Sequence, residues 1–264
     1  MARRGLTLPQ LVMTVALSAV ILLFVLTQAH HHQHPGSHSG SQALLCLVGL
    51  VLVALFLAGK AALAVSRTRD LERLAGSLGA SFQADPRESP LSPDAQELQL
   101  FRLGILPRLE NLLSLSATSD PVVSCFDYSY VLRNELGPNP RTGAPVDNRL
   151  AQTVVALRWS GTRWPSLKVA GRAWLGEPAG SQKEISLEDA PDFSRHYRVF
   201  AEDQERAREA LSAEARTLLE QTPGLTVEAG GDSLIVYRPF KLCPPGEVSE
   251  LIRLAERVAA AMKA

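Results

Sequence analysis

Two long apolar segments near the N-terminus constrain the fold of this chain more than any other feature. The first covers residues 6–29 without a charged residue, and the second covers residues 43–65 with Lys60 as its single charge. About 20 apolar residues are enough for a helix to cross the hydrocarbon core of a bilayer. Each segment therefore predicts a membrane span, and together they predict an N-terminal two-helix transmembrane hairpin.

The charges around this predicted hairpin indicate its orientation. The connecting loop, residues 30–42, contains no lysine or arginine, whereas basic residues flank the outer ends of the pair: Arg3, Arg4, Arg67, Arg69 and Arg73. Lysine and arginine are enriched in the cytoplasmic segments of membrane proteins. We therefore expect a multi-pass protein of the inner (cytoplasmic) membrane, with the lipid bilayer as a partner and both termini in the cytoplasm.

Two alternatives remain open for the first apolar segment. Thr27-Gln28-Ala29 resembles the small-residue cleavage site of a signal peptide. The first ten residues resemble the processing signal of type IV prepilins, in which cleavage would follow Gly5. Gln10 stands where that family carries a glutamate, and a pilin has no second span. A cleaved signal would leave the second segment as the anchor, with the following domain still in the cytoplasm.

A histidine-rich loop separates the two apolar segments. Clustered imidazole nitrogens on a flexible loop can bind Zn, Ni or Cu. The alternative is a polar turn that only reverses the chain. The metal interpretation predicts metal sensing or capture by five residues, His30, His31, His32, His34 and His38.

The remainder of the chain predicts a linker and one folded domain. Residues 66–97 read as a juxtamembrane helix, capped by Gly79, followed by a linker rich in proline and serine. Residues 98–264 contain two amphipathic helical segments, 203–221 and one that starts after Gly246. The strand-like segments of this domain are 98–103, 111–117, 121–133, 152–159, 167–175 and a hairpin over 226–238. This order predicts an α+β domain with a mainly antiparallel β-sheet.

The same domain resembles a recurrent bacterial family of membrane-anchored α+β proteins without an assigned function. The resemblance covers roughly residues 70–262, and Asn111 and the triplet Phe126-Asp127-Tyr128 match the expected pattern. It rests on the strings LFRLGILPRLENLLS, VVSCFDYSY, QTVVALRW, RHYRVFAEDQERAREAL and LTVEAGGDSLIVYR. WPSLKVAGRAWL matches more loosely. The resemblance implies a fold but no catalytic residue.

The chemical motifs of common enzyme classes do not occur in the sequence. It has no Gly-rich phosphate loop, HExxH, paired CxxC or GxSxG. Asp127, beside Tyr128 and Tyr130, is the candidate for an enzymatic alternative, because a buried carboxyl can serve as a general acid or base. Its structural alternative is a hydrogen bond to the backbone or to a tyrosine.

Other reactive residue types are scattered. We expect Cys125 and Cys243 to be core residues and His196 to have no ligand role. The net charge of zero argues against nucleic acid as a partner. No catalytic or cofactor-binding residue is assigned. The sequence therefore favours a membrane-anchored, non-enzymatic interaction or scaffolding module that faces the cytoplasm and binds a protein partner or self-associates.

Overall fold

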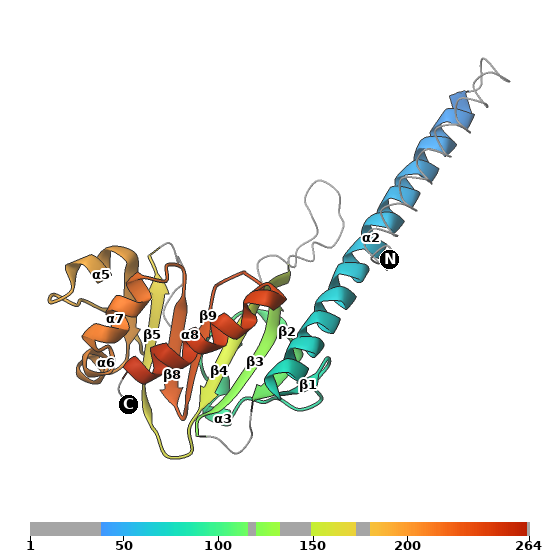
Figure 1. The fold of residues 1–264 in the computed structure, drawn as a ribbon. Helices are drawn as coiled ribbons and strands as arrows, with labels where there is room; N and C mark the ends of the chain where they lie inside the picture. Colours follow the sequence, from blue (N-terminus) through green and yellow to red (C-terminus); the bar gives the residue numbers. More distant parts are fainter. Residues whose placement is uncertain (1–37, 116–119, 133–148, 173–179, 263–264) are drawn as a thin grey trace. The chain divides into compact units, whose positions relative to one another are not determined.

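The computed structural model describes residues 38–115, 120–132, 149–172 and 180–262 (Figure 1). The chain divides into two units, Met1–Asp70 and Leu71–Ala264. The described part of the first unit is a single helix, α2 (His38–Leu78), whose last residues belong to the second unit. This helix ends where the sequence predicts, because Gly79 follows it with a φ of 66° that glycine adopts without strain.

The structure corrects the predicted membrane hairpin. Of the helices in the described ranges, none is long and apolar enough to cross a membrane. The predicted second span, residues 43–65, is not a separate helix, because α2 continues without a break through the charged segment 66–78. The predicted first span lies outside the described residues. The transmembrane hairpin, and with it the multi-pass inner-membrane location and orientation, is therefore contradicted.

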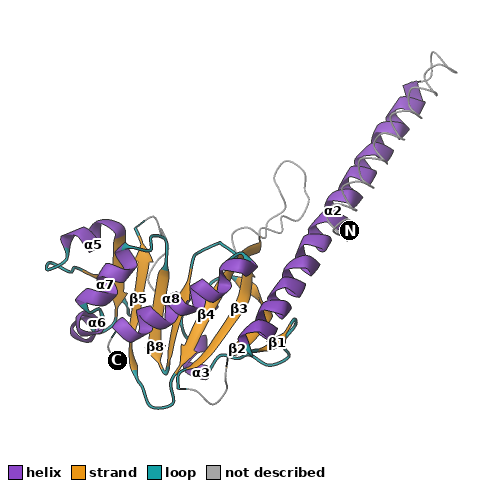
Figure 2. Cartoon of the chain, in the orientation of Figure 1, coloured by secondary structure: helices purple, strands orange, loops and turns teal. Residues whose placement is uncertain are grey.

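The second unit is built on a nine-stranded sheet in which every pairing is antiparallel. The strand order is β1-β2-β3-β4-β9-β8-β5-β7-β6, so the β8–β9 hairpin lies between β4 and β5 (Figure 2). The strands are β1 (Ser81–Gln83), β2 (Ile105–Leu115), β3 (Val122–Val131), β4 (Arg149–Arg158), β5 (Trp164–Gly171), β6 (Lys183–Ile185), β7 (Tyr197–Ala201), β8 (Thr226–Gly231) and β9 (Ser233–Tyr237). The predicted mainly antiparallel sheet is present.

The helices differ more from the prediction than the strands do. Segment 98–103, expected as a strand, contains the short helix α4 (Gln99–Arg102), which follows α3 (Pro93–Gln96). The expected helix 203–221 is two helices, α6 (Gln204–Ala210) and α7 (Ala213–Glu220), because the Ser212 hydroxyl caps a new helix. The others are α5 (Pro191–His196), the 3-10 turn η2 (Pro245–Glu247) and the predicted C-terminal helix α8 (Val248–Ala261).

The sheet has two differently covered faces, because successive side chains of a strand point to opposite sides. The α8 face packs the larger apolar core against α6, α7 and α8, and includes Val155, Val227 and Val236. The α3–α4 face carries a smaller cluster around Phe126, Tyr128 and Tyr130, covered by the segment that contains α3 and α4. Figure 1 shows α8 lying across the strands. α3 contacts β8 and β9, which lie in the middle of the strand order.

Candidate functional site

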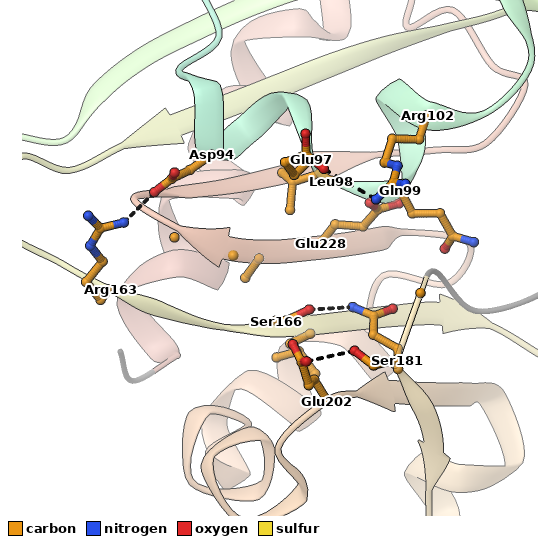
Figure 3. A pocket seen from close by; sticks show the side chains of 16 residues that line it. Asp94, Glu97, Leu98, Gln99, Arg102, Arg163, Ser166, Ser181, Glu202 and Glu228 are labelled. Atoms are coloured by element: carbon orange, nitrogen blue, oxygen red, sulfur yellow. Dashed lines mark hydrogen bonds and ion pairs between the residues drawn. The ribbon is translucent and has the colours of Figure 1, made fainter.

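A polar cleft of about 420 Å³ opens where the α3–α4 segment meets β5 and β8 (Figure 3). It is the candidate site, because it gathers charged and amide side chains from segments far apart in the sequence. We call it the polar cleft and define it by the polar side chains that line it: Asp94, Glu97, Gln99, Arg102, Arg163, Ser166, Ser181, Gln182, Glu202 and Glu228.

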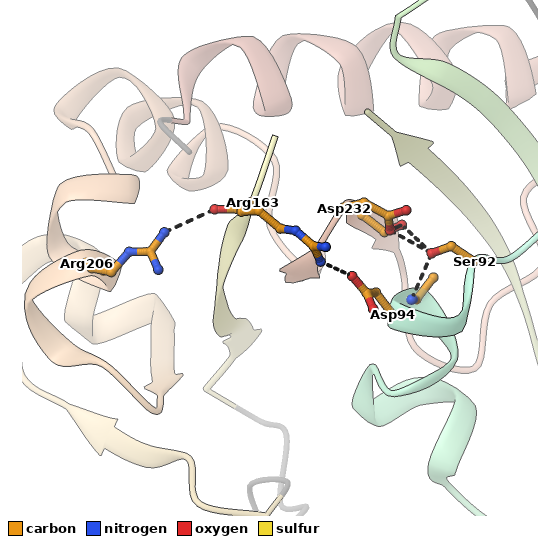
Figure 4. Close-up of polar contacts among 7 residues, drawn as sticks. Ser92, Asp94, Arg163, Arg206 and Asp232 are labelled. Carbon is orange, nitrogen blue, oxygen red and sulfur yellow. Dashed lines mark hydrogen bonds and ion pairs between the residues drawn. The ribbon is translucent and has the colours of Figure 1, made fainter. Parts of the chain in front are cut away.

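The first wall of the polar cleft is held in place by the N-terminal cap of α3. The Ser92 hydroxyl accepts a hydrogen bond from the Ala95 N–H at 3.1 Å, and it donates to Asp232 Oδ1 at 2.6 Å (Figure 4). Asp232 belongs to the turn between β8 and β9. Gly231 precedes it with a φ of 58°, and a Cβ there would collide with the Asp94 side chain. The cap and the glycine together fix α3 on the hairpin.

Ion pairs form the rim of the cleft. Arg163 pairs with Asp94, and the Arg163 carbonyl accepts a hydrogen bond from Arg206 at 3.0 Å (Figure 4). Arg102 pairs with Glu97 at 3.3 Å. All four side chains of these two pairs are substantially exposed, so each pair contributes about 0–1 kcal/mol to stability. Their role is to neutralise one another's charge at the mouth of the cleft.

The floor of the cleft is a buried ion pair. Lys168 on β5 lies directly opposite Glu228 on β8, and Nζ is 3.0 Å from Glu228 Oε1. The two side chains are 1% and 2% exposed. Lys168 also donates to Gln99 Oε1 at 2.8 Å. Burying two charges is unfavourable unless both are hydrogen-bonded.

Glu228 satisfies that condition through three neighbours. Its Oε1 accepts from Lys168 and from the Tyr237 hydroxyl at 2.6 Å, and its Oε2 accepts from the Leu100 N–H at 3.1 Å. The last bond explains why segment 98–103 is not a strand: its backbone is bound to a side chain of the sheet. Lys168 is buried and held by both Glu228 and Gln99, so its role is structural.

The tyrosines beside this pair remain protonated at neutral pH. Burial raises the pKa of Tyr237 well above its ordinary value, and the charge and hydrogen bond of Glu228 raise it further. Burial raises the pKa of Tyr130 to about 12, with smaller contributions from Tyr128 and Glu228. Burial likewise raises the pKa of Tyr128 to about 12. Tyr237 therefore acts as a hydrogen-bond donor to Glu228.

The second wall offers acceptor atoms. Gln182 Nε2 donates to Ser166 Oγ at 3.0 Å, and the Ser181 hydroxyl donates to Glu202 Oε1 at 2.7 Å. Gln182 Oε1 is buried and has no hydrogen-bond partner within the described residues. A buried acceptor of this kind is costly unless a partner binds it. The wall is suited to a ligand that donates hydrogen bonds.

Asp127, the sequence candidate for catalysis, lies elsewhere. Its Oδ2 accepts from Asn111 Nδ2 at 2.9 Å, and its Oδ1 accepts from the Thr153 hydroxyl at 2.8 Å. By strand alternation it points to the α8 face, whereas Tyr128 and Tyr130 belong to the cluster on the other face. The predicted combination of Asp127 with those tyrosines does not form. Its role is to tie β2, β3 and β4 together.

The remaining sequence candidates contribute nothing to the cleft. His30, His31, His32 and His34 lie outside the described residues, and His38 is the first residue of α2. The metal hypothesis therefore stays a prediction. In the described ranges, no cluster of three or more potential metal ligands occurs. His196 is exposed at the end of α5, and the two domain cysteines, Cys125 and Cys243, are buried.

Sequence reasoning missed the residues of the cleft floor. Lys168 and Glu228 lie within the strand-like segments 167–175 and 226–238, and no role was predicted for either residue. No local signal marked them. Side chains two positions apart share a face of a strand, and those neighbours are small or polar: Ser166 and Ala170 beside Lys168, and Thr226 and Gly230 beside Glu228.

Comparison with known proteins yields a shared fold. No family model and no curated protein matches the chain. Among solved structures, the chain is similar to the mycobacterial trehalose monomycolate transport factor A, TtfA, at 13% sequence identity and a TM-score of 0.51. The match covers 74% of this chain and 93% of that one. The likeness shows the fold alone, and the family suggested by the sequence stays a prediction.

Proposed function

We propose that this chain is a non-enzymatic binding module, an accessory factor in transport, whose polar cleft holds a hydroxyl-rich ligand. One contrast within the cleft carries the proposal. The charged groups of the cleft form ion pairs and hydrogen bonds within the protein, whereas one buried acceptor, Gln182 Oε1, has no partner within the described residues. Engaged charges hold a site in shape, and an unpartnered acceptor selects what enters it.

The carboxylates of the cleft all have partners within the protein, which disfavours a catalytic role. A general acid or base needs a carboxyl available to a substrate. In the cleft, Asp94 and Glu97 pair with arginines, and Glu202 accepts from Ser181. Glu228 accepts three hydrogen bonds from the surrounding protein. These contacts support a binding role.

The ligand class follows from charge and hydrogen-bonding capacity. The cleft presents three carboxylates at its surface, those of Asp94, Glu97 and Glu202, against two arginines, so it disfavours anions. Its second wall presents acceptor atoms from Gln182 and Glu202. Hydroxyl groups donate hydrogen bonds without adding charge, as in a carbohydrate. An uncharged, hydroxyl-rich molecule is therefore the ligand that we propose.

The shared fold supplies the context of transport. TtfA is described as a transport factor for trehalose monomycolate. A transport accessory must hold a molecule or a partner without changing it, which agrees with a cleft whose polar groups are already hydrogen-bonded. The expected protein partner or self-association remains compatible with this role, since a bound ligand and a partner surface can coexist on one domain.

Titration of the full chain with trehalose, followed by saturation-transfer NMR, tests the proposal. We expect saturable transfer to the sugar protons and an unchanged sugar spectrum over hours. Gln182→Leu removes the buried acceptor and should weaken binding about tenfold, because a lost hydrogen bond in a closed site is worth about 1.4 kcal/mol. Gln204→Leu is the matched control, since Gln204 is exposed on α6 and outside the cleft lining.

Three results would contradict the proposal. Equal transfer in the wild type and in Gln182→Leu would place any sugar binding outside the cleft. Stronger binding of putrescine, a diamine, than of trehalose would replace the hydroxyl-rich class by a cationic one. Hydrolysis of the sugar would show that the module is an enzyme.

A further inference from the structure

A second cavity lies on the α8 face, at the C-terminal end of α8. Its volume is about 630 Å³, and its lining comes from the ends of β2, β4 and β5 and from the last turn of α8. Leu157, Trp159, Trp164 and Met262 make most of it apolar. Sites for small organic ligands are typically of this size, apolar and aromatic, with few polar groups. The polar cleft shares none of its residues.

The two tryptophans give the cavity an aromatic wall with one hydrogen-bond donor. Their rings meet edge to face, with centroids 5.2 Å apart. Trp164 is only 6% exposed, and its indole Nε1–H is buried with no hydrogen-bond partner within the described residues. A buried indole N–H normally finds an acceptor. A bound molecule with an oxygen atom at that place would supply one.

The charges around the cavity restrict the ligand further. Among the described residues that line it, Asp120 and Glu256 are the charged ones, and both are acidic. Asp120 is held in place by Ser160, whose N–H and hydroxyl donate to it at 3.1 and 3.0 Å. Glu256 is exposed on α8. These two carboxylates repel an anion, whatever its apolar part.

We propose that this cavity binds an uncharged apolar molecule that carries a carbonyl or ether oxygen, with that oxygen accepting the Trp164 N–H. The apolar body lies against Trp159, Leu157 and Met262. The corresponding carboxylate anion, of equal chain length, binds more weakly, because Asp120 and Glu256 repel it. This site is independent of the polar cleft, and its ligand class is opposite in polarity.

Quenching of tryptophan fluorescence by brominated probes tests the proposal on the full chain. The probes are methyl 11-bromoundecanoate, the matched 11-bromoundecanoate anion and 1-bromoundecane, which has no acceptor. Residues 1–65 contain no tryptophan, so uptake of a probe by that apolar part of the chain does not enter the signal. We expect saturable quenching by the ester and about tenfold weaker binding of the anion at pH 8.

Three variants localise the effect. Trp164→Phe, with Trp159 as the remaining reporter in the cavity, should weaken ester binding about three- to tenfold and bromoalkane binding less, because both probes lose ring contacts and only the ester loses a hydrogen bond. Glu256→Gln should narrow the gap between the ester and the anion. Ala260→Phe places a ring at the cavity mouth and should abolish quenching by ester and bromoalkane, whereas the same change at exposed Ala213 on α7 should not.

Several results would overturn the proposal. Quenching that rises linearly with ester concentration and is unchanged in Ala260→Phe would show partition without a site. Equal affinity of the ester and the anion in the wild type would remove the role of the two carboxylates. A Trp164→Phe variant that binds ester and bromoalkane as the wild type does would remove the hydrogen bond to the indole.

Discussion

The two faces of the sheet are covered in different ways, one by apolar helices and the other by a short segment that is held by a buried ion pair. The α8 face is covered by α6, α7 and α8, whose apolar side chains exclude water from a large core. The α3–α4 face is covered by two helices of four residues each and has a cluster of ten buried residues. The short segment that contains α3 and α4 cannot bury enough apolar area to fix its own position. On this face the buried ion pair fixes the position of the segment, because Glu228 accepts a hydrogen bond from the segment's backbone.

This difference explains where the two cavities lie and what each accepts. The polar cleft opens beside the ion pair, where Gln99 and Glu228 contribute to both the network and the lining. The apolar cavity opens at the end of α8, where the helical cover stops. Four predictions test the comparison.

The largest effect is expected from the ion pair. Lys168→Met leaves Glu228 buried without its cation, and we expect the free energy of unfolding to fall by about 3–5 kcal/mol. Denaturant unfolding monitored by circular dichroism measures it. The double variant Lys168→Met/Glu228→Leu is the control and should recover part of the loss, because no charge stays buried but the Leu100 N–H and the Tyr237 hydroxyl lose their acceptor. A loss below about 1 kcal/mol in the single variant would mean that water already reaches the pair.

Two leucine-to-alanine substitutions, one on each face, compare how much stability each face contributes. Leu251 on α8 is 3% exposed, and Leu251→Ala should cost about 2–5 kcal/mol through lost burial and the space left behind. Leu98 is 7% exposed and lines the polar cleft. Leu98→Ala should cost less, because solvent from the cleft can fill the space. Equal losses in denaturant unfolding would contradict the unequal covering of the two faces.

Substitution of Asp127 tests whether this residue has a structural role or a catalytic one. Asp127→Asn puts an amide where two donors, Asn111 Nδ2 and the Thr153 hydroxyl, now find carboxylate oxygens. We expect a loss of about 1–3 kcal/mol in the free energy of unfolding. Ligand binding in the polar cleft should not change, since Asp127 points to the opposite face. Loss of cleft binding with unchanged stability would assign Asp127 to the site after all.

The smallest effect near neutral pH comes from the tyrosines, and it becomes visible only in alkali. Burial raises the pKa of Tyr128, Tyr130 and Tyr197 to about 12 from the ordinary value of 10.0, and that of Tyr237 well above the ordinary value. Between these values the unfolded chain loses protons that the folded chain keeps. Stability is therefore fully present below pH 10 and falls as the pH rises toward 12.

Absorbance at 295 nm measures this titration. These four residues are all the tyrosines of the chain. We expect little tyrosinate at pH 10.5 in the folded protein and its appearance together with unfolding. A fraction that titrates normally near pH 10 while the circular dichroism stays native would show that one face is open to solvent.

The sequence indicated the strands of the sheet better than the elements that cover it. β3, β4 and the β8–β9 hairpin have apolar and β-branched residues at strand spacing, so local pattern was enough. The start of the helical segment at residue 203 and the C-terminal helix also agree with the prediction. α4 was taken for a strand because four residues are too few to show a helical period, and its conformation depends on Glu228, which is distant in the sequence.

The site could not be predicted, for a related reason. Ser92, Lys168, Gln182 and Glu228 come from four separate segments, and no local pattern relates them. The apolar segment 43–65 shows the opposite failure: its composition predicted a membrane span, but the structure continues the helix through charged residues and none of the described helices qualifies as a span. Composition alone did not determine how that segment is used.

The central claim is that the polar cleft binds a hydroxyl-rich ligand through the buried acceptor of Gln182. The most direct measurement follows the side-chain amide signals of Gln182 in the full chain labelled with ¹⁵N-glutamine, as trehalose is added. We expect a saturable shift of the Gln182 signal, while the Gln204 signal on α6 stays fixed. A Gln182 signal that does not move at sugar concentrations that saturate the protein by any other measure would contradict it.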